Sequence, residues 1–245
     1  MTRSPEGPAG AGQFPSTHWS IVLQARDRAS PQADEALAEL CRAYWYPLYA
    51  YIRHRAGSAD QAQDLTQEFF ARLLEKHFLG AVDRDKGRFR AFLLACCRHF
   101  LANERDRERA QKRGGGRPVL SLDFATAEER YLREPAHDVT AERLFERRWA
   151  LTLLEQTLGQ LEAEYRRDGK HGLYEQLHGT LIGGESTPYT QVGAVLGMSE
   201  SAVKKAAQRL RHRYREVLRE RICSTVDDPA HADDEIRSLF VALRP

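Results

Sequence analysis

The 245-residue sequence predicts an all-α fold of two helical domains joined by a linker. Apolar residues recur every three or four positions through most of the chain, and no stretch shows the strict alternation of a half-buried strand. Glycine, proline and acidic residues interrupt the helical pattern between the two domains. The segments that we expect are a flexible tail at 1–13, a helical domain at 14–113, a linker at 114–140 with room for one short helix, a helical domain at 141–225 and an acidic amphipathic extension at 226–245.

The composition excludes several classes of protein. Because 42% of the residues are hydrophobic, the chain can bury a core and is not expected to be disordered. The net charge of +2 conceals a strong segregation, since residues 84–117 carry a net charge of +7. A local positive field of this kind suits nucleic acids. No run of about 18 apolar residues is present. The four cysteines lack the spacing of a metal site, so we expect free thiols, a cytoplasmic location and no cofactor.

The first domain begins with two expected helices. Thr17 suits the cap of a helix that starts at His18, and a second helix is expected from about Gln32 to Arg55. Five aromatic residues crowd the second helix: Tyr44, Trp45, Tyr46, Tyr49 and Tyr51. Aromatic residues also stack on nucleic-acid bases. At helical spacing, however, they more often form a core, and we favour a core location.

The next helix, expected at 58–77, has an acidic face. Ser58 and Gln61 form a capping box at its start, and Leu65, Phe69 and Leu73 share an inward face. The outward residues are Asp60, Asp64, Gln67, Glu68 and Arg72. An acidic surface cannot help to bind nucleic acid, and beside basic segments it therefore indicates a protein partner.

Basic and aromatic residues mix in the region that follows. Residues 79–88 are expected to form a loop, and Phe89 opens a long helix that ends at three consecutive glycines. Cations for phosphates and rings for bases are what a single-strand-binding groove needs. The alternative places the rings in the core and the charges in solvent, but it leaves the local surplus of positive charge unexplained.

Residues 186–221 predict a helix-turn-helix. Thr187 caps a short helix with Pro188 at its first position, Gly197 supplies a left-handed stop and Ser199 caps the second helix. The residues expected to be buried are Val192, Val195, Leu196, Val203, Ala207, Leu210, Tyr214 and Val217. Residues 203–221 carry a net charge of +6, as suits a helix that enters the major groove. The alternative is an ordinary helical hairpin with a solvated basic face.

The C-terminal extension contains one short amphipathic helix, because Ile236, Leu239, Phe240 and Leu243 recur at helical spacing behind three acidic residues. A helix this short is marginal alone, so we expect it to dock. It either completes the core of the second domain or lays its acidic end on the basic helix 199–221 and competes with DNA.

The order of these segments resembles a known family. The stretch DQAQDLTQEFFARLL resembles the polymerase-binding helix of region 2 in bacterial sigma factors. The stretch GRFRAFLLACCRHFLANERDRERAQKR resembles the promoter-melting region, and the helix-turn-helix resembles region 4. The segment between them is too short for a region 3 domain. The chain therefore resembles the extracytoplasmic-function (group 4) sigma factors of the sigma-70 superfamily over nearly all of residues 14–222.

This resemblance implies a promoter-specificity subunit whose partners are core RNA polymerase, promoter DNA and, as a further candidate, an anti-sigma or other regulatory protein. The residues it places at the polymerase are Asp64, Gln67, Glu68 and Arg72. The residues it places at the −10 element are Lys86, Arg88, Phe89, Arg90, His99 and Asn103. The residues expected at the −35 element are Ser199, Ser201, Lys204, Lys205, Gln208, Arg209 and Arg213. His99 and Asn103 depart from the family, where asparagine and aspartate are usual.

Two other functions compete with this interpretation. A stand-alone helix-turn-helix regulator would need residues 14–113 as its sensor or dimer domain, and their acidic-then-basic order argues against it. A nucleic-acid-processing enzyme would use Asp60, Asp64 and Glu68 as metal ligands, but no ligand from a second element is evident. No nucleophile with a placed histidine and no phosphate-binding glycine motif is present, so we expect no enzyme.

Overall fold

The computed structural model describes residues 33–73, 88–110, 123–133, 139–181, 187–226 and 228–244. Across these ranges all regular structure is helical, which confirms the all-α prediction. The α-helices are α2 (Ala33–Arg55), α3 (Ala59–Leu73), α4 (Phe89–Ala110), α5 (Phe124–Leu132), α6 (Ala141–Arg167), α7 (His171–Leu177), α8 (Tyr189–Leu196), α9 (Glu200–Thr225) and α10 (Ala232–Ala242). The expected tail, the helix expected to start at His18, most of the loop at 79–88 and the glycine run lie outside the described residues.

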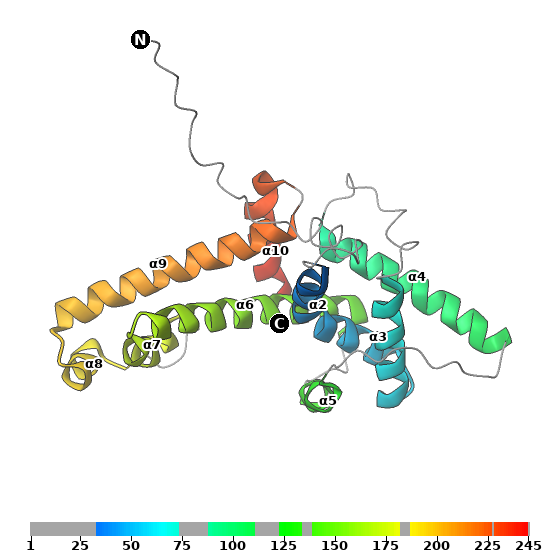
Figure 1. Ribbon diagram of the computed structural model, residues 1–245, viewed down its shortest axis with the longest axis horizontal. Coiled ribbons are helices and arrows are strands. Elements are labelled where there is room, and N and C mark those ends of the chain that lie inside the picture. Colours follow the sequence, from blue (N-terminus) through cyan, green and yellow to red (C-terminus); the bar gives the residue numbers. More distant parts are fainter. Residues whose placement is uncertain are drawn as a thin grey trace, which may run out of the picture.

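The molecule is elongated, and two long helices give it this shape (Figure 1). α6 and α9 are packed against each other and run from the end that carries α7 and α8 to the middle of the molecule, where α2 and α10 lie. The helices α7 and α8 lie at one end together with the start of α9. The helices α2 to α5 lie toward the other end, and α10 sits beside the final turns of α9.

The crowded aromatic residues of α2 form the centre of the first core, as predicted. Tyr44, Tyr46, Tyr49 and Tyr51 are all buried. Trp45 is partly buried and packs against the same cluster. Phe69 of α3 contacts Phe100 of α4 with ring centroids 5.6 Å apart, which ties these two helices together.

Helix α5 lies within the range expected to be a linker. Its Asp123 cap accepts a hydrogen bond from the Thr126 amide, as an N-cap aspartate does. Phe124 meets Trp45 and Tyr49 edge-on, with centroids 5.7 and 5.5 Å away. Glu128 accepts hydrogen bonds from Arg53 of α2. These contacts fix α5 on the outer face of α2.

The two hydrophobic clusters share two helices. The first half of α6 places Phe145 and Trp149 in the cluster built around α2, whereas Leu161 belongs to a second cluster with the helix-turn-helix. Helix α9 also contributes to both clusters, since Leu210 lies in the second cluster and Ile222, nearer its end, lies in the first. Residues 141–225 therefore contribute side chains to both cores.

Local signals in the sequence place several helix ends. The Ser58 hydroxyl accepts a hydrogen bond from the Gln61 amide, and the Gln61 side chain accepts one from Gly57. These bonds are those of the predicted capping box, with the reciprocal bond one residue earlier.

Among the described helices, none combines the length and the apolar character that crossing a membrane requires. All four cysteines are free thiols, as expected, and burial raises the pKa of Cys41 and Cys96 to about 11.

Candidate nucleic-acid and protein interfaces

The helix-turn-helix consists of α8, a short turn and α9. Gly197 ends α8 with φ of 64°, a left-handed conformation that glycine adopts without steric cost. The Ser199 hydroxyl then accepts a hydrogen bond from the Ala202 amide at the start of α9. Val203, Ala207 and Leu210 are fully buried against α7 and α8. The predicted turn and cap are thus confirmed. The predicted buried stripe of α9 is confirmed at Val217 as well, whereas Tyr214 is only partly buried.

Two predictions about α8 are wrong. The helix begins at Tyr189, so Pro188 is the cap residue rather than the first helical residue, and no side chain caps it. Val195, expected to be buried, is 64% exposed. Helix α8 is short and meets α9 through Val192 and its neighbour Gly193, which are both buried. A side chain at Gly193 would meet the Met198 carbonyl oxygen at 2.5 Å, so this close approach needs glycine. Sequence reasoning missed Gly193.

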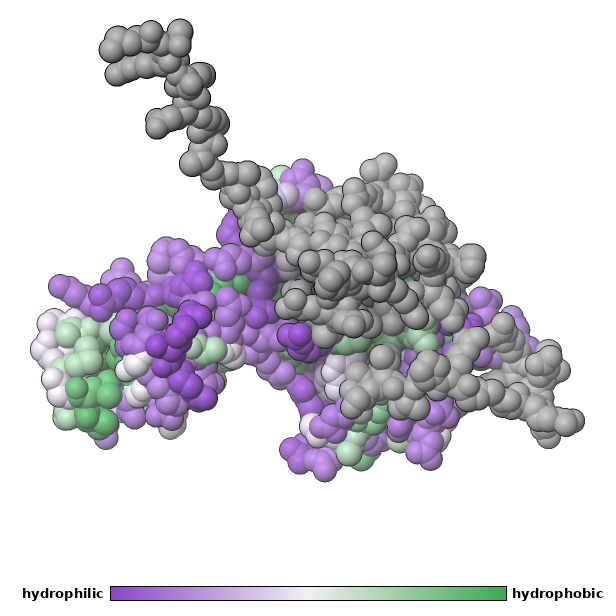
Figure 2. Space-filling view, in the orientation of Figure 1, coloured by the Kyte–Doolittle hydropathy of each residue, from purple (hydrophilic) through white to green (hydrophobic). Residues whose placement is uncertain are grey.

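The first turns of α9 present a polar face with three cations to solvent. Six of the expected −35 residues are exposed there: Ser199, Ser201, Lys204, Lys205, Gln208 and Arg209. Hydrophilic residues run along α9 in the space-filling view, and hydrophobic residues gather at the end that carries α8 (Figure 2). Lys204 lies 2.6 Å from Glu200, which raises the pKa of its ammonium group. This face can therefore offer both hydrogen-bonding and positively charged groups to a duplex.

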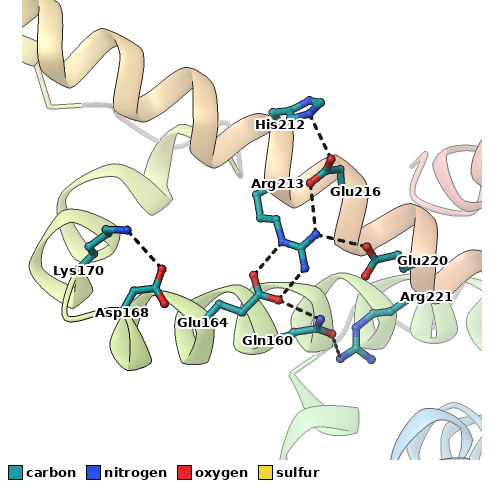
Figure 3. A network of polar contacts seen from close by, with 9 residues as sticks. All are labelled: Gln160, Glu164, Asp168, Lys170, His212, Arg213, Glu216, Glu220 and Arg221. Atoms are coloured by element: carbon teal, nitrogen blue, oxygen red, sulfur yellow. Dashed lines mark hydrogen bonds and ion pairs between the residues drawn. The ribbon is translucent and has the colours of Figure 1, made fainter. Parts of the chain in front are cut away.

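Arg213, the seventh expected −35 residue, points toward α6 instead (Figure 3). Its Nε and one terminal nitrogen each donate to the Glu164 carboxylate at 2.9 Å. The other terminal nitrogen lies 3.3 Å from both Glu216 and Glu220. The bond from Arg213 holds the pKa of Glu164 below its usual range. In this conformation Arg213 fastens α9 to α6, and its donors face carboxylates rather than solvent.

A second contact close to this one joins the same two helices. Arg221 donates to the Gln160 side chain at 2.8 Å, and Gln160 in turn donates to Glu164 (Figure 3). The Arg213–Glu164 pair is bidentate, and bidentate arginine–carboxylate pairs fix the relative orientation of their helices as well as stabilising the contact. The angle between α9 and α6, and therefore the position of the basic face, is set by this polar network together with the apolar contacts of both clusters.

The expected −10 residues on α4 divide into an exposed and a covered group. His99 and Asn103 are exposed one turn apart, beside exposed Arg98. Phe89 is buried, with its ring 5.3 Å from that of Tyr44. Arg90 is buried as well, and burial lowers its pKa although Glu146 opposes this shift. Lys86 lies outside the described residues.

Arg88, another residue expected at the −10 element, is half-exposed at the start of α4. Its Nε lies 2.9 Å from the carboxylate of Glu235 in α10. Arg90 pairs with the same carboxylate and also donates to Glu146 of α6 at 2.6 Å. In this conformation, neither Phe89 nor Arg90 is accessible to a strand of DNA.

Helix α3 carries the expected polymerase-facing residues. Asp64 is exposed, while Gln67, Glu68 and Arg72 are half-buried. Arg72 pairs with Glu68 at 2.8 Å and with Glu104 of α4 at 2.7 Å. Its guanidinium also lies over the Phe100 ring, 5.1 Å from the centroid. Arg72 therefore anchors α3 to α4, and Asp64 is the most accessible of the three charged residues.

The carboxylates that the enzyme hypothesis requires do not form a shared site. Glu68 is held by Arg72, as described above. Within the ranges that the structure describes, no three His, Cys, Asp or Glu side chains gather as they would around a metal ion.

The chain matches a known protein family. A model of the family described as "ECF sigma factor" matches residues 31–220, which is most of the chain. The matched range covers α2 to the last turns of α9 and ends before α10. No curated protein and no solved structure is similar enough to this chain to count as a match.

Proposed function

Because the chain belongs to the ECF sigma factor family, and is thus a sigma subunit for transcription initiation, we propose that it binds core RNA polymerase, recognises the −35 and −10 elements and assists promoter melting. Three surfaces would divide this work. Helix α3 would bind polymerase, α4 would hold the non-template strand of the −10 element, and the start of α9 would read the −35 element as duplex. The same proposal places the protein in the cytoplasm, where polymerase and chromosome meet.

The observation that carries this proposal is the exposed face at the start of α9. Ser201, Lys204, Lys205 and Gln208 lie in its first turns, where a recognition helix reaches base edges. The start of α9 lies at one end of the elongated molecule, so a duplex could approach it without meeting α2 to α4 (Figure 1). We assign Arg209 and Arg215, which are exposed further along α9, to phosphates. We assign Arg213 to positioning α9.

The exposed part of α4 supports the −10 assignment. His99 and Asn103, one turn apart, and the neighbouring Arg98 offer donors and one positive charge on the exposed part of α4. Such groups suit single-stranded DNA, in which bases and phosphates are both accessible. Arg88 would join this surface only after it parts from Glu235, and Arg90 would also have to part from Glu146.

A charge reversal on α3 tests the polymerase assignment. Asp64→Lys should reduce co-purification with core polymerase at least about tenfold while changing the free energy of unfolding by less than about 0.5 kcal/mol. Glu129→Lys is the matched control, because Glu129 is an exposed carboxylate on α5. Equal retention of polymerase by both variants would contradict the role of α3.

The −35 assignment is tested by footprinting with Lys205→Ala on promoter variants. If Lys205 reads a base, the variant loses about 1–3 kcal/mol at that position and relaxes its preference there. Uniform losses across all −35 sequences would instead place Lys205 at a phosphate. A stand-alone regulator, the rival function, would give the same footprint without polymerase.

A further inference from the structure

Helix α10 is docked against both halves of the molecule. Its Ala232 and Leu239 are buried in the first cluster, where they meet residues of α6 and α9. Asp233 pairs with Arg219 on the exposed side of α9. Figure 1 shows α10 beside the last turns of α9, near the level at which α4 begins. In this conformation the segment beyond the matched family range is therefore docked on α6 and α9.

The buried carboxylate of Glu235 gives this docking its specificity. Its side chain is 1% exposed and pairs with Arg88 and Arg90 at the start of α4. A buried carboxylate needs such partners, because an uncompensated charge is strongly unfavourable inside a protein. Arg90 is locked from its other sides by Glu146 and by the Trp149 ring, 4.2 Å below its guanidinium. Glu235 thus closes a network that joins α4, α6 and α10.

The two arginines that Glu235 engages are ones assigned above to the −10 strand. A guanidinium binds a carboxylate and a phosphate by the same charge-assisted contacts. We propose that Glu235 occupies the place of a DNA phosphate, so that α10 is an autoinhibitory segment that must leave α4 before Arg88 binds single-stranded DNA. Arg90, which Glu146 and Trp149 also hold, keeps the start of α4 in place. This inference rests on the proposed function, because it concerns the same −10 surface.

Three consecutive acidic residues supply a matched set of variants. Asp233→Asn, Asp234→Asn and Glu235→Gln each raise the net charge by one, so they change the long-range attraction of DNA equally. They differ in what they release. Glu235 pairs with Arg88 at the start of α4, and Asp233 pairs with Arg219 of α9. Asp234 pairs with Arg237 of its own helix and interacts with Arg88 only through the weaker attraction of their charges. Any difference among the three therefore reports the docking of α10.

The test measures the affinity of the full chain for a labelled single-stranded oligonucleotide by fluorescence anisotropy, at the same salt concentration for every variant. Only molecules in which α10 has left α4 can bind the oligonucleotide, so the apparent affinity falls in proportion to the fraction of such molecules. Because Glu235→Gln should raise this fraction, we expect it to bind the oligonucleotide about tenfold more tightly than the wild type. The affinity of Asp233→Asn for the oligonucleotide should lie between those of Glu235→Gln and Asp234→Asn. Asp233→Asn leaves no buried charge unpaired, so it still tests the inference if Glu235→Gln folds poorly. The inference is overturned if neither variant binds more tightly than Asp234→Asn.

Transcription with core polymerase separates this inference from the function on which it rests. If the wild type supports initiation but the three variants bind the oligonucleotide equally, the autoinhibitory role is wrong and the sigma function stands. If Glu235→Gln binds more tightly but no form of the protein supports initiation, α10 still shields a nucleic-acid site and the proposed function is wrong.

Discussion

Arg213 illustrates why charge alone does not identify DNA contacts on α9. Residues 203–221 hold eight cations that look alike in the sequence. The structure distinguishes them by their neighbours, since Arg213 is bound to Glu164 and Arg221 to Gln160, whereas Lys205 and Arg209 are exposed. A residue 49 positions away in the sequence decides the role of Arg213.

We expect Arg213→Ala to act mainly on stability and Lys205→Ala to act mainly on DNA binding. Loss of the partly exposed Arg213–Glu164 pair should lower the free energy of unfolding by about 1–2 kcal/mol, less than a fully buried pair would. Lys205→Ala should change stability by less than about 0.5 kcal/mol but weaken duplex binding. Chemical denaturation and DNA footprinting measure the two effects. A destabilised Lys205→Ala beside an unaffected Arg213→Ala would reverse these roles.

The lowered pKa of Glu164 predicts a dependence on pH. The bond from Arg213 favours the ionised carboxylate in the folded state, so its contribution to stability is full above the ordinary pKa near 4.5 and disappears as the pH falls through the lower, folded value. Glu164→Gln should therefore be less stable than the wild type at pH 7, and the difference should shrink toward pH 3. Denaturation series at several pH values measure it. Glu162→Gln, which removes an exposed partner of Arg166, is the control and should show a much smaller difference.

At the scale of the element, the turn of the helix-turn-helix depends on one close backbone approach. Gly193→Ala places a methyl group against the Met198 carbonyl, and backbone cannot yield as a flexible side chain can. We expect a loss of about 1–3 kcal/mol in stability and a shifted α8. Gly159→Ala is the control, because its Cβ would meet nothing within 4 Å, and it should gain about 0.5–1 kcal/mol in the interior of α6. Equal melting temperatures for the two variants would show that the turn tolerates the methyl group.

Much of each element could be predicted from local sequence. The Gly197 stop, the Ser199 cap and the 3–4 spacing from Val203 to Leu210 specify α9, because caps and periodicity act within a few residues. The exposure of Val195 could not be predicted in this way, since it depends on how a short helix lies on its neighbours. The same holds for Glu235, which local pattern placed at the dipole of its own helix but which tertiary packing pairs with α4.

At the scale of the whole molecule, α6 and α9 connect the two clusters. Leu161 and Phe145 lie on one helix but in different clusters, so a cluster cannot come apart without strain on the shared helix. We expect one cooperative unfolding transition rather than two. Native-state hydrogen exchange should show similar opening free energies for amides near Leu48 and near Leu210. A much lower opening free energy near Leu210 would show that the helix-turn-helix unfolds separately.

The proposed function requires the three surfaces to act together at a promoter, and run-off transcription from genomic fragments with core polymerase tests this requirement most directly. The wild type should direct initiation at discrete start sites that core polymerase alone does not use. Asp64→Lys should abolish these transcripts through α3, and Lys205→Ala should reduce or redistribute them through α9. Sequence-specific DNA binding by the protein alone, with no transcript added to those of core polymerase, would contradict the account.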